Sequence, residues 1–147
     1  MWELGEVFQG GVEEVNQTLV DGLNRQLDSL YPNASKQLDR LGELPDAVRE
    51  DVVASLLKYA CQSQHIGNIA LARKTLSTIP RPCLSMVLET AIQKNVDLSD
   101  EWEYRRLLEL LREIESDLLS DFVNRGLASD DLEIRETAGD FRSGSIE

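Results

Sequence analysis

Apolar residues recur at three- and four-residue steps along most of this 147-residue chain, and no alternating apolar pattern is long enough for a strand. The first apolar stripe comprises Val12, Val15, Leu19, Leu23, Leu27 and Leu30. Polar side chains occupy the positions between them, as in a helix that buries one face. The sequence therefore predicts an all-α fold.

Glycines and prolines divide the later stripes into separate helices. Tyr31-Pro32 ends the first helix, because proline disfavours the helical conformation of the residue before it. A brief helical segment is expected over residues 35–41, and further helices are expected after Pro45, Gly67, Pro82, Asp100, Ser116 and Asp130. Asp100 with Glu103, and Asp130 with Glu133, have the spacing of a capping box. Gly126 is placed to end the helix after Ser116 in the left-handed conformation.

About seven helices joined by short loops favour antiparallel neighbours. We therefore expect stacked antiparallel helical hairpins, either a HEAT-like α-solenoid or an irregular helical bundle. Residues 1–11 form an N-terminal arm in this interpretation, residues 12–141 a single all-helical domain, and residues 142–147 a polar tail. The arm either docks through its apolar residues or stays mobile.

One motif occurs twice. The segment Asp46-Ala47-Val48-Arg49-Glu50 is similar to 131–136, in which Ile134 precedes Arg135 and Glu136. The two arginines are 86 residues apart, which is two steps of 43, within the roughly 40 to 47 residues of HEAT repeats. The stretch 127–138 resembles the start of a HEAT-type helix, and the end of the chain weakly resembles immunity proteins of bacterial toxin systems. The second resemblance implies that the chain binds a toxin domain and catalyses nothing.

Catalytic motifs are missing from the sequence. Its one histidine, His65, lies four residues after Cys61, but nothing in the sequence fixes a third group to orient it, so a surface or loop-capping role is favoured. The sequence contains no glycine-rich phosphate loop, no calcium loop and no His-Glu-x-x-His motif. We expect no enzyme activity, no cofactor and no metal.

Cellular location is inferred from what the sequence lacks. Its first residues are acidic where a signal peptide is basic, and no apolar run approaches the roughly 20 residues of a membrane span. Two cysteines are too few for a disulfide framework. These features predict a cytoplasmic protein that does not bind membranes.

The charge of the chain is strongly negative and uneven. Its 27 acidic and 15 basic side chains give −12, and residues 97–147 hold 15 of the acidic ones against 6 basic ones. Residues 52–88 hold no acidic side chain and four basic ones. Such a chain repels nucleic acid, and if hairpins stack in chain order its C-terminal end is electronegative.

The candidate binding residues follow from this imbalance. A stripe of apolar residues on 101–114 is expected to face the core, which puts Trp102 on the opposite face with Arg106 and the acidic residues. Trp102 is then either an interface anchor or a staple packed on 96–98. The residues expected to bind a partner are Glu101, Trp102, Glu109, Glu113, Asp117, Asp121, Asp130 and Asp131.

We therefore expect a non-enzymatic protein-binding module that uses an acidic C-terminal face to bind a basic protein. Its sharpest form is an immunity protein that occludes a basic toxin, such as a nuclease. The alternative is a HEAT-like adaptor or scaffold that holds a helix or peptide in an apolar groove. A third class of function, an enzyme with an unrecognised carboxylate site, predicts a bound metal. For the acidic run itself, another interpretation is that it only keeps the protein soluble.

Overall fold

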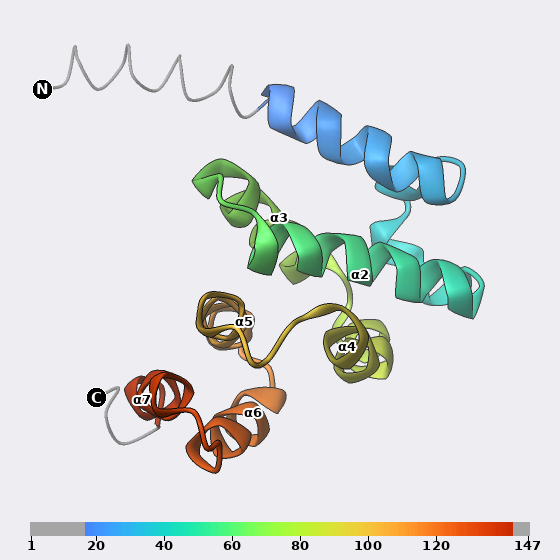
Figure 1. The fold of residues 1–147 in the computed structure, drawn as a ribbon. Helices are drawn as coiled ribbons and strands as arrows, with labels where there is room; N and C mark the ends of the chain where they lie inside the picture. Colours follow the sequence, from blue (N-terminus) through green and yellow to red (C-terminus); the bar gives the residue numbers. More distant parts are fainter. Residues whose placement is uncertain (1–16, 143–147) are drawn as a thin grey trace, which may run out of the picture.

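The computed structural model describes residues 17–142, and these residues contain helices and no strand (Figure 1). A helix over 17–30 is followed by the short 3-10 helices η1 (Ala34–Lys36) and η2 (Leu38–Glu43). Six α-helices then follow: α2 (Asp46–Gln62), α3 (Ile66–Thr78), α4 (Arg81–Asn95), α5 (Glu101–Glu113), α6 (Leu118–Leu127) and α7 (Leu132–Asp140). The all-α prediction is confirmed.

The helices stack in layers that follow the order of the chain (Figure 1). Helix α2 packs against α3, α4 and α5, and α5 packs in turn against α6 and α7. The layers are therefore the hairpin α2–α3, the pair α4 and α5, which both pack on α2 and contact each other little, and the hairpin α6–α7. Helix 17–30 covers the first hairpin through buried Leu23 and Leu27. A Cβ at Gly67 would lie only 2.7 Å from Cδ1 of Leu19, so glycine permits this close approach.

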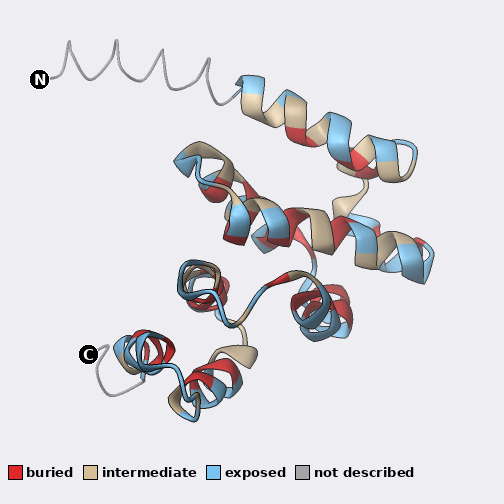
Figure 2. Ribbon diagram, in the orientation of Figure 1, coloured by how far each residue is buried: buried red, intermediate tan, exposed pale blue. Residues whose placement is uncertain are grey.

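The first two pairs of helices are related by a 35-residue step. Helices α2 and α4 start at residues 46 and 81, and α3 and α5 start at 66 and 101, so both pairs are 35 residues apart. In the third pair only buried positions of α6 keep this step, because α6 and α7 start at 118 and 132. Buried residues recur at 35-residue intervals in three sets: Val52, Val87 and Phe122, then Val53, Leu88 and Val123, then Leu56, Ala91 and Gly126. The two interfaces between layers pack differently, because α2 contacts both α4 and α5 whereas α5 contacts both α6 and α7, and buried residues line both interfaces (Figure 2).

Ion pairs connect equivalent helices of adjacent hairpins. Lys94 Nζ lies 3.2 Å from Glu50 between α4 and α2, and Arg125 lies 3.3 Å from Glu89 between α6 and α4. On the other side of the stack, Arg105 lies 2.9 Å from Asp140 between α5 and α7. These partly exposed pairs add little stability individually.

Helix starts alternate in type along the stack. Pro45 and Pro80 precede α2 and α4, whereas polar side chains cap the second helix of each hairpin. His65 Nδ1 accepts from the N–H groups of Gly67 and Asn68, Asp100 from those of Trp102 and Glu103, and Asp131 from those of Glu133 and Ile134. The loop-capping role predicted for His65 is confirmed.

Several local predictions need correction. Residues 35–41 form 3-10 helices rather than a short α-helix, with a non-helical kink at Arg40. Asp131, not Asp130, caps α7, because only Asp131 reaches the first-turn amides. Gly126 does not end α6 in the left-handed conformation, since no glycine in the described part of the chain has positive φ.

The repeated Arg-Glu motif marks a shared helix start, not a structural repeat. Arg49 is on the first helix of a hairpin and Arg135 on the second. Both sit in the first turn and reach back to the preceding loop: Arg49 donates to the carbonyls of Gly42 and Leu44, and Arg135 to that of Ser129. The motif recurs because an arginine at this position braces the loop before its helix.

The arm predicted over 1–11 and residues 143–147 of the predicted tail lie outside the described residues. No helix within 17–142 is long and apolar enough to span a bilayer.

Candidate functional site

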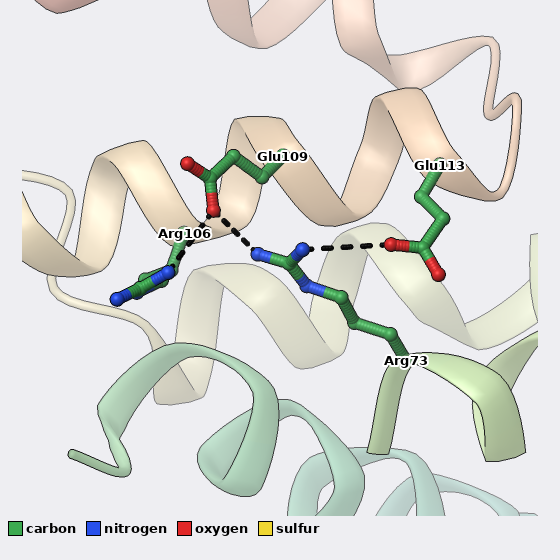
Figure 3. Close-up of polar contacts among 4 residues, drawn as sticks. All are labelled: Arg73, Arg106, Glu109 and Glu113. Carbon is green, nitrogen blue, oxygen red and sulfur yellow. Dashed lines mark hydrogen bonds and ion pairs between the residues drawn. The ribbon is translucent and has the colours of Figure 1, made fainter. Parts of the chain in front are cut away.

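Two of the carboxylates expected to bind a partner, Glu109 and Glu113, lie in an ion-pair network between α3 and α5, with Glu113 still exposed (Figure 3). Arg73 of α3 places Nη2 2.5 Å from Oε1 of Glu109 and Nη1 3.4 Å from Oε1 of Glu113. Arg106 lies 3.2 Å from the same Glu109 oxygen. Leu110 is fully buried as well, because α5 lies between two layers and has no wide exposed face. Glu109 therefore joins two helices.

The predicted acidic end is partly neutralised in this way. Arg81 also pairs with Glu115, and Arg125 lies 3.3 Å from Asp121. The cations of the middle helices thus compensate the carboxylates that face them. The remaining negative charge concentrates elsewhere on the last two hairpins.

The exposed ring of Trp102 is held by its own helix. Its residue is 52% exposed, and the guanidinium carbon of Arg106 lies 4.4 Å from the ring centroid. Arg106 is held in turn by Glu109, which is held by Arg73. Of the two positions expected for Trp102, the structure shows the exposed one, with one face of the ring against Arg106.

The start of α5 is anchored by Asp100 and Glu103, though not as a complete capping box. Asp100 accepts from the N–H groups of Trp102 and Glu103 at 2.9 and 3.0 Å. Glu103 Oε1 accepts from the Asp97 N–H at 2.9 Å and from Gln62 Nε2 at 3.1 Å. Glu103 therefore links the 96–100 loop to the end of α2.

The loops inside the three hairpins lie along one side of the stack. Gln62 and Gln64 line a pocket of about 560 Å³ together with Asp100, Trp102 and Glu103. A second pocket, of about 340 Å³, brings the 96–100 loop and the 128–131 loop together. Its lining residues are Leu98, Ser99, Tyr104, Arg125, Gly126, Ser129 and Ile134. Residues 63–66, 96–103 and 128–133 thus form a continuous hollowed surface, which we name the loop edge.

The loop edge is rich in acidic side chains. Residues 63–66 carry no acidic side chain, whereas the rest of the edge carries Asp97, Asp100, Glu101, Glu103, Asp130, Asp131 and Glu133. Within residues 17–142, no Lys or Arg forms an ion pair with any of these seven. Residues 1–16 and 143–147 contain no Lys, Arg or His.

The predicted binding residues therefore divide into three groups. Glu101, Trp102, Asp130 and Asp131 lie on the loop edge, and Asp131 also caps α7. Glu109, Glu113 and Asp121 lie in ion pairs. Asp117 is exposed at a separate pocket of about 220 Å³, beside Arg81 and Leu84.

Sequence reasoning missed two exposed apolar residues on the loop edge. Ile66 is 78% exposed and Leu132 is 58% exposed, each as the first residue of its helix. The sequence signal is their position directly after the capping residues His65 and Asp131, which places them outside the buried stripe of each helix.

Thiol chemistry finds no support in the geometry. Cys61 is buried, and burial raises the pKa of its thiol to about 12. His65 uses Nδ1 to cap α3. No group of His, Cys, Asp and Glu side chains within residues 17–142 is arranged to hold a metal ion. Comparisons of the chain with family models, with curated proteins and with solved structures find no match.

Proposed function

We propose that the chain is a non-catalytic protein-binding module whose loop edge recognises a basic protein. The observation that carries this proposal is the separation of paired from unpaired carboxylates. Glu109, Glu113 and Asp121 are compensated by arginines, while Glu101, Asp130 and Glu133 on the loop edge have no such partner among the described residues.

Unpaired surface carboxylates raise the free energy of the isolated protein through mutual repulsion, and a cationic partner relieves it. They also accelerate association with a basic protein and reject acidic ones. Affinity then comes from a few desolvated anchors, for which the half-exposed ring of Trp102 is suited.

The sharpest form of the proposal is an immunity protein that occludes a basic toxin, with nucleases as the leading class. Its carboxylates would compete with substrate phosphates for the lysines and arginines of the toxin. The start of α7 supports the HEAT-like resemblance locally, through its Asp131 cap and Arg135 brace. The 35-residue step is shorter than the roughly 40 to 47 residues of HEAT repeats, so we propose the broader class of helical-repeat binding modules.

The product of the neighbouring gene is the partner to test, because an immunity gene adjoins its toxin gene. We expect that product to be basic, to form a stoichiometric complex with this chain by size-exclusion chromatography, and to lose its toxicity when the two are co-expressed. A neighbouring product that is acidic, or that shows no complex, contradicts the immunity form.

The adaptor alternative has one observation in its favour. The pocket of about 220 Å³ between α4 and the loop after α5 has apolar walls formed by Leu84, Leu88, Ile114 and Leu118. A peptide anchored there depends little on ionic strength, whereas binding at the loop edge weakens steeply between low and high salt. A salt titration of the complex therefore separates the two.

A further inference from the structure

Three exposed apolar residues lie in the first turns of α3, α5 and α7. Ile66 and Leu132 directly follow the capping residues His65 and Asp131, and Trp102 is the second residue after Asp100. Met86 on α4 is the other large apolar side chain that is strongly exposed within the described residues. We name Ile66, Trp102 and Leu132 the apolar row.

The apolar row runs along the loop edge across the layers. The pocket of about 560 Å³ joins the loop before Ile66 to Trp102, since Gln64 and Trp102 both line it. The pocket of about 340 Å³ joins the loops before Trp102 and Leu132, since Ser99 and Ser129 both line it. A partner that lies along the edge therefore crosses both hollows as it passes the loops that carry these three residues.

Charge is distributed unequally along the row. The Ile66 end has no acidic neighbour on its loop, whereas carboxylates flank the other two positions: Asp100, Glu101 and Glu103 beside Trp102, and Asp130, Asp131 and Glu133 beside Leu132. Charge complementarity requires a partner segment with apolar residues along its length and Lys or Arg beside two of the three contacts.

The state of the backbone at the edge favours a helical partner over an extended one. The N–H groups at the starts of α3, α5 and α7 are already bonded to His65, Asp100 and Asp131. The carbonyl groups of an extended peptide would therefore lose water without gaining these N–H donors. A helix satisfies its backbone groups internally. Packed helices such as α5 and α7 lie about 8 to 10 Å apart, which matches roughly seven residues of a helix at 1.5 Å each.

We propose that the apolar row docks an amphipathic helix of the basic partner, with apolar residues at heptad spacing and Lys or Arg beside the contacts to Trp102 and Leu132. This inference rests on the proposed function, because it names the segment by which the basic protein is bound. The helix lies across the three layers, with its neutral end over Ile66.

The probe for this inference is a fluorescein-labelled helical peptide of about 18 residues. It carries leucines roughly seven residues apart and lysines beside the last two. Fluorescence anisotropy measures its binding to the full chain. Control peptides replace the leucines by serine or the lysines by glutamate, and we expect neither to bind at concentrations up to about 1 mM.

The variants are Ile66→Ser, Trp102→Ser and Leu132→Ser, with Met86→Ser as the matched control. All four residues are exposed, so the fold tolerates each change, and circular dichroism verifies this. We expect each change in the row to weaken binding by about tenfold, and Met86→Ser by less than about twofold.

The outcomes separate this inference from the proposed function. Suppose that peptide binding is unchanged by every substitution in the apolar row but falls in the double variant Glu101→Gln and Glu133→Gln. This result contradicts docking on the apolar row and still supports binding to the acidic surface. No binding of the lysine peptide to the wild-type chain overturns the row as well. In that case the complex with the neighbouring gene's product judges the proposed function independently.

Discussion

The hydroxyl of Tyr104 on α5 donates a 2.7 Å hydrogen bond to the carbonyl of Phe122 on α6, directly over the helix position held by Gly126. A Cβ at residue 126 would lie 1.9 Å from that hydroxyl oxygen and 2.8 Å from Cβ of Ala138 on α7. Helices α5, α6 and α7 meet here. Glycine is needed at this position for its lack of a side chain rather than for an unusual backbone angle.

Gly126→Ala is therefore expected to lower the free energy of unfolding by at least about 2 kcal/mol, since three fully packed elements must move apart. Gly139→Ala on α7 is the matched control. A Cβ there meets nothing within 4 Å, so stability stays constant or rises by up to about 1 kcal/mol. Urea denaturation followed by circular dichroism measures both. Equal effects of the two changes on the free energy of unfolding would contradict the close packing of Tyr104 and Ala138 around Gly126.

The link between α3 and α5 is tested by a double-mutant cycle on Arg73→Met and Glu109→Gln. The two side chains are 16% and 27% exposed, so their coupling should exceed that of a fully exposed pair and reach about 1 kcal/mol. Lys74→Met serves as the control for Arg73, because Lys74 is exposed on the same helix. Zero coupling between Arg73 and Glu109 would mean that Glu109 faces solvent, as the sequence alone suggested.

The register of the α7 start is tested by two adjacent alanine substitutions. Asp131→Ala removes the acceptor for the N–H groups of Glu133 and Ile134 and should cost about 1 kcal/mol. Asp130→Ala removes no cap and should change the free energy of unfolding by less than about 0.5 kcal/mol. The opposite ranking would restore Asp130 as the cap.

Alkaline pH should destabilise the fold through Cys61 and Tyr104. Burial raises the pKa of each group to about 12, from ordinary values of 9.0 and 10.0. Between the ordinary and the raised pKa the unfolded chain loses a proton that the folded chain keeps. The free energy of unfolding therefore falls by about 1.4 kcal/mol per pH unit for each group above its ordinary pKa.

Thiol labelling tests the burial on which this effect depends. At pH 8 a thiol-specific reagent should react slowly with the folded chain, because burial raises the pKa of both Cys61 and Cys83, and should label both once urea unfolds it. Rapid labelling of Cys61 in the native protein would contradict its burial. Cys61→Ala should remove part of the alkaline loss of stability.

Helical periodicity predicted most of the fold, because the buried stripe of each helix is visible as three- and four-residue steps. Pro45 and Pro80 mark helix starts correctly because their backbone chemistry acts locally, whereas Gly67 lies inside α3. The 35-residue step escaped notice because equivalent positions share only apolar character, as with Leu56, Ala91 and Gly126.

The candidate site was predicted less completely. The exposure of Trp102 and Glu101 was predicted correctly because it follows from the stripe on their own helix. The partner of Glu109 is an arginine 36 residues away on another helix, which a single helical pattern does not reveal. Ile66 and Leu132 were missed because an exposed apolar residue looks like a core residue until the helix faces are known.

The most direct test of the acidic edge is the salt dependence of binding to the basic partner. One variant carries Glu101→Gln, Asp130→Asn and Glu133→Gln on the loop edge. The matched control carries Asp39→Asn, Glu43→Gln and Asp51→Asn, which are exposed residues outside the loop edge. The account predicts that the slope of log Kd against log salt falls by about half in the first variant and stays unchanged in the control. Equal slopes for the wild type and both variants would contradict it.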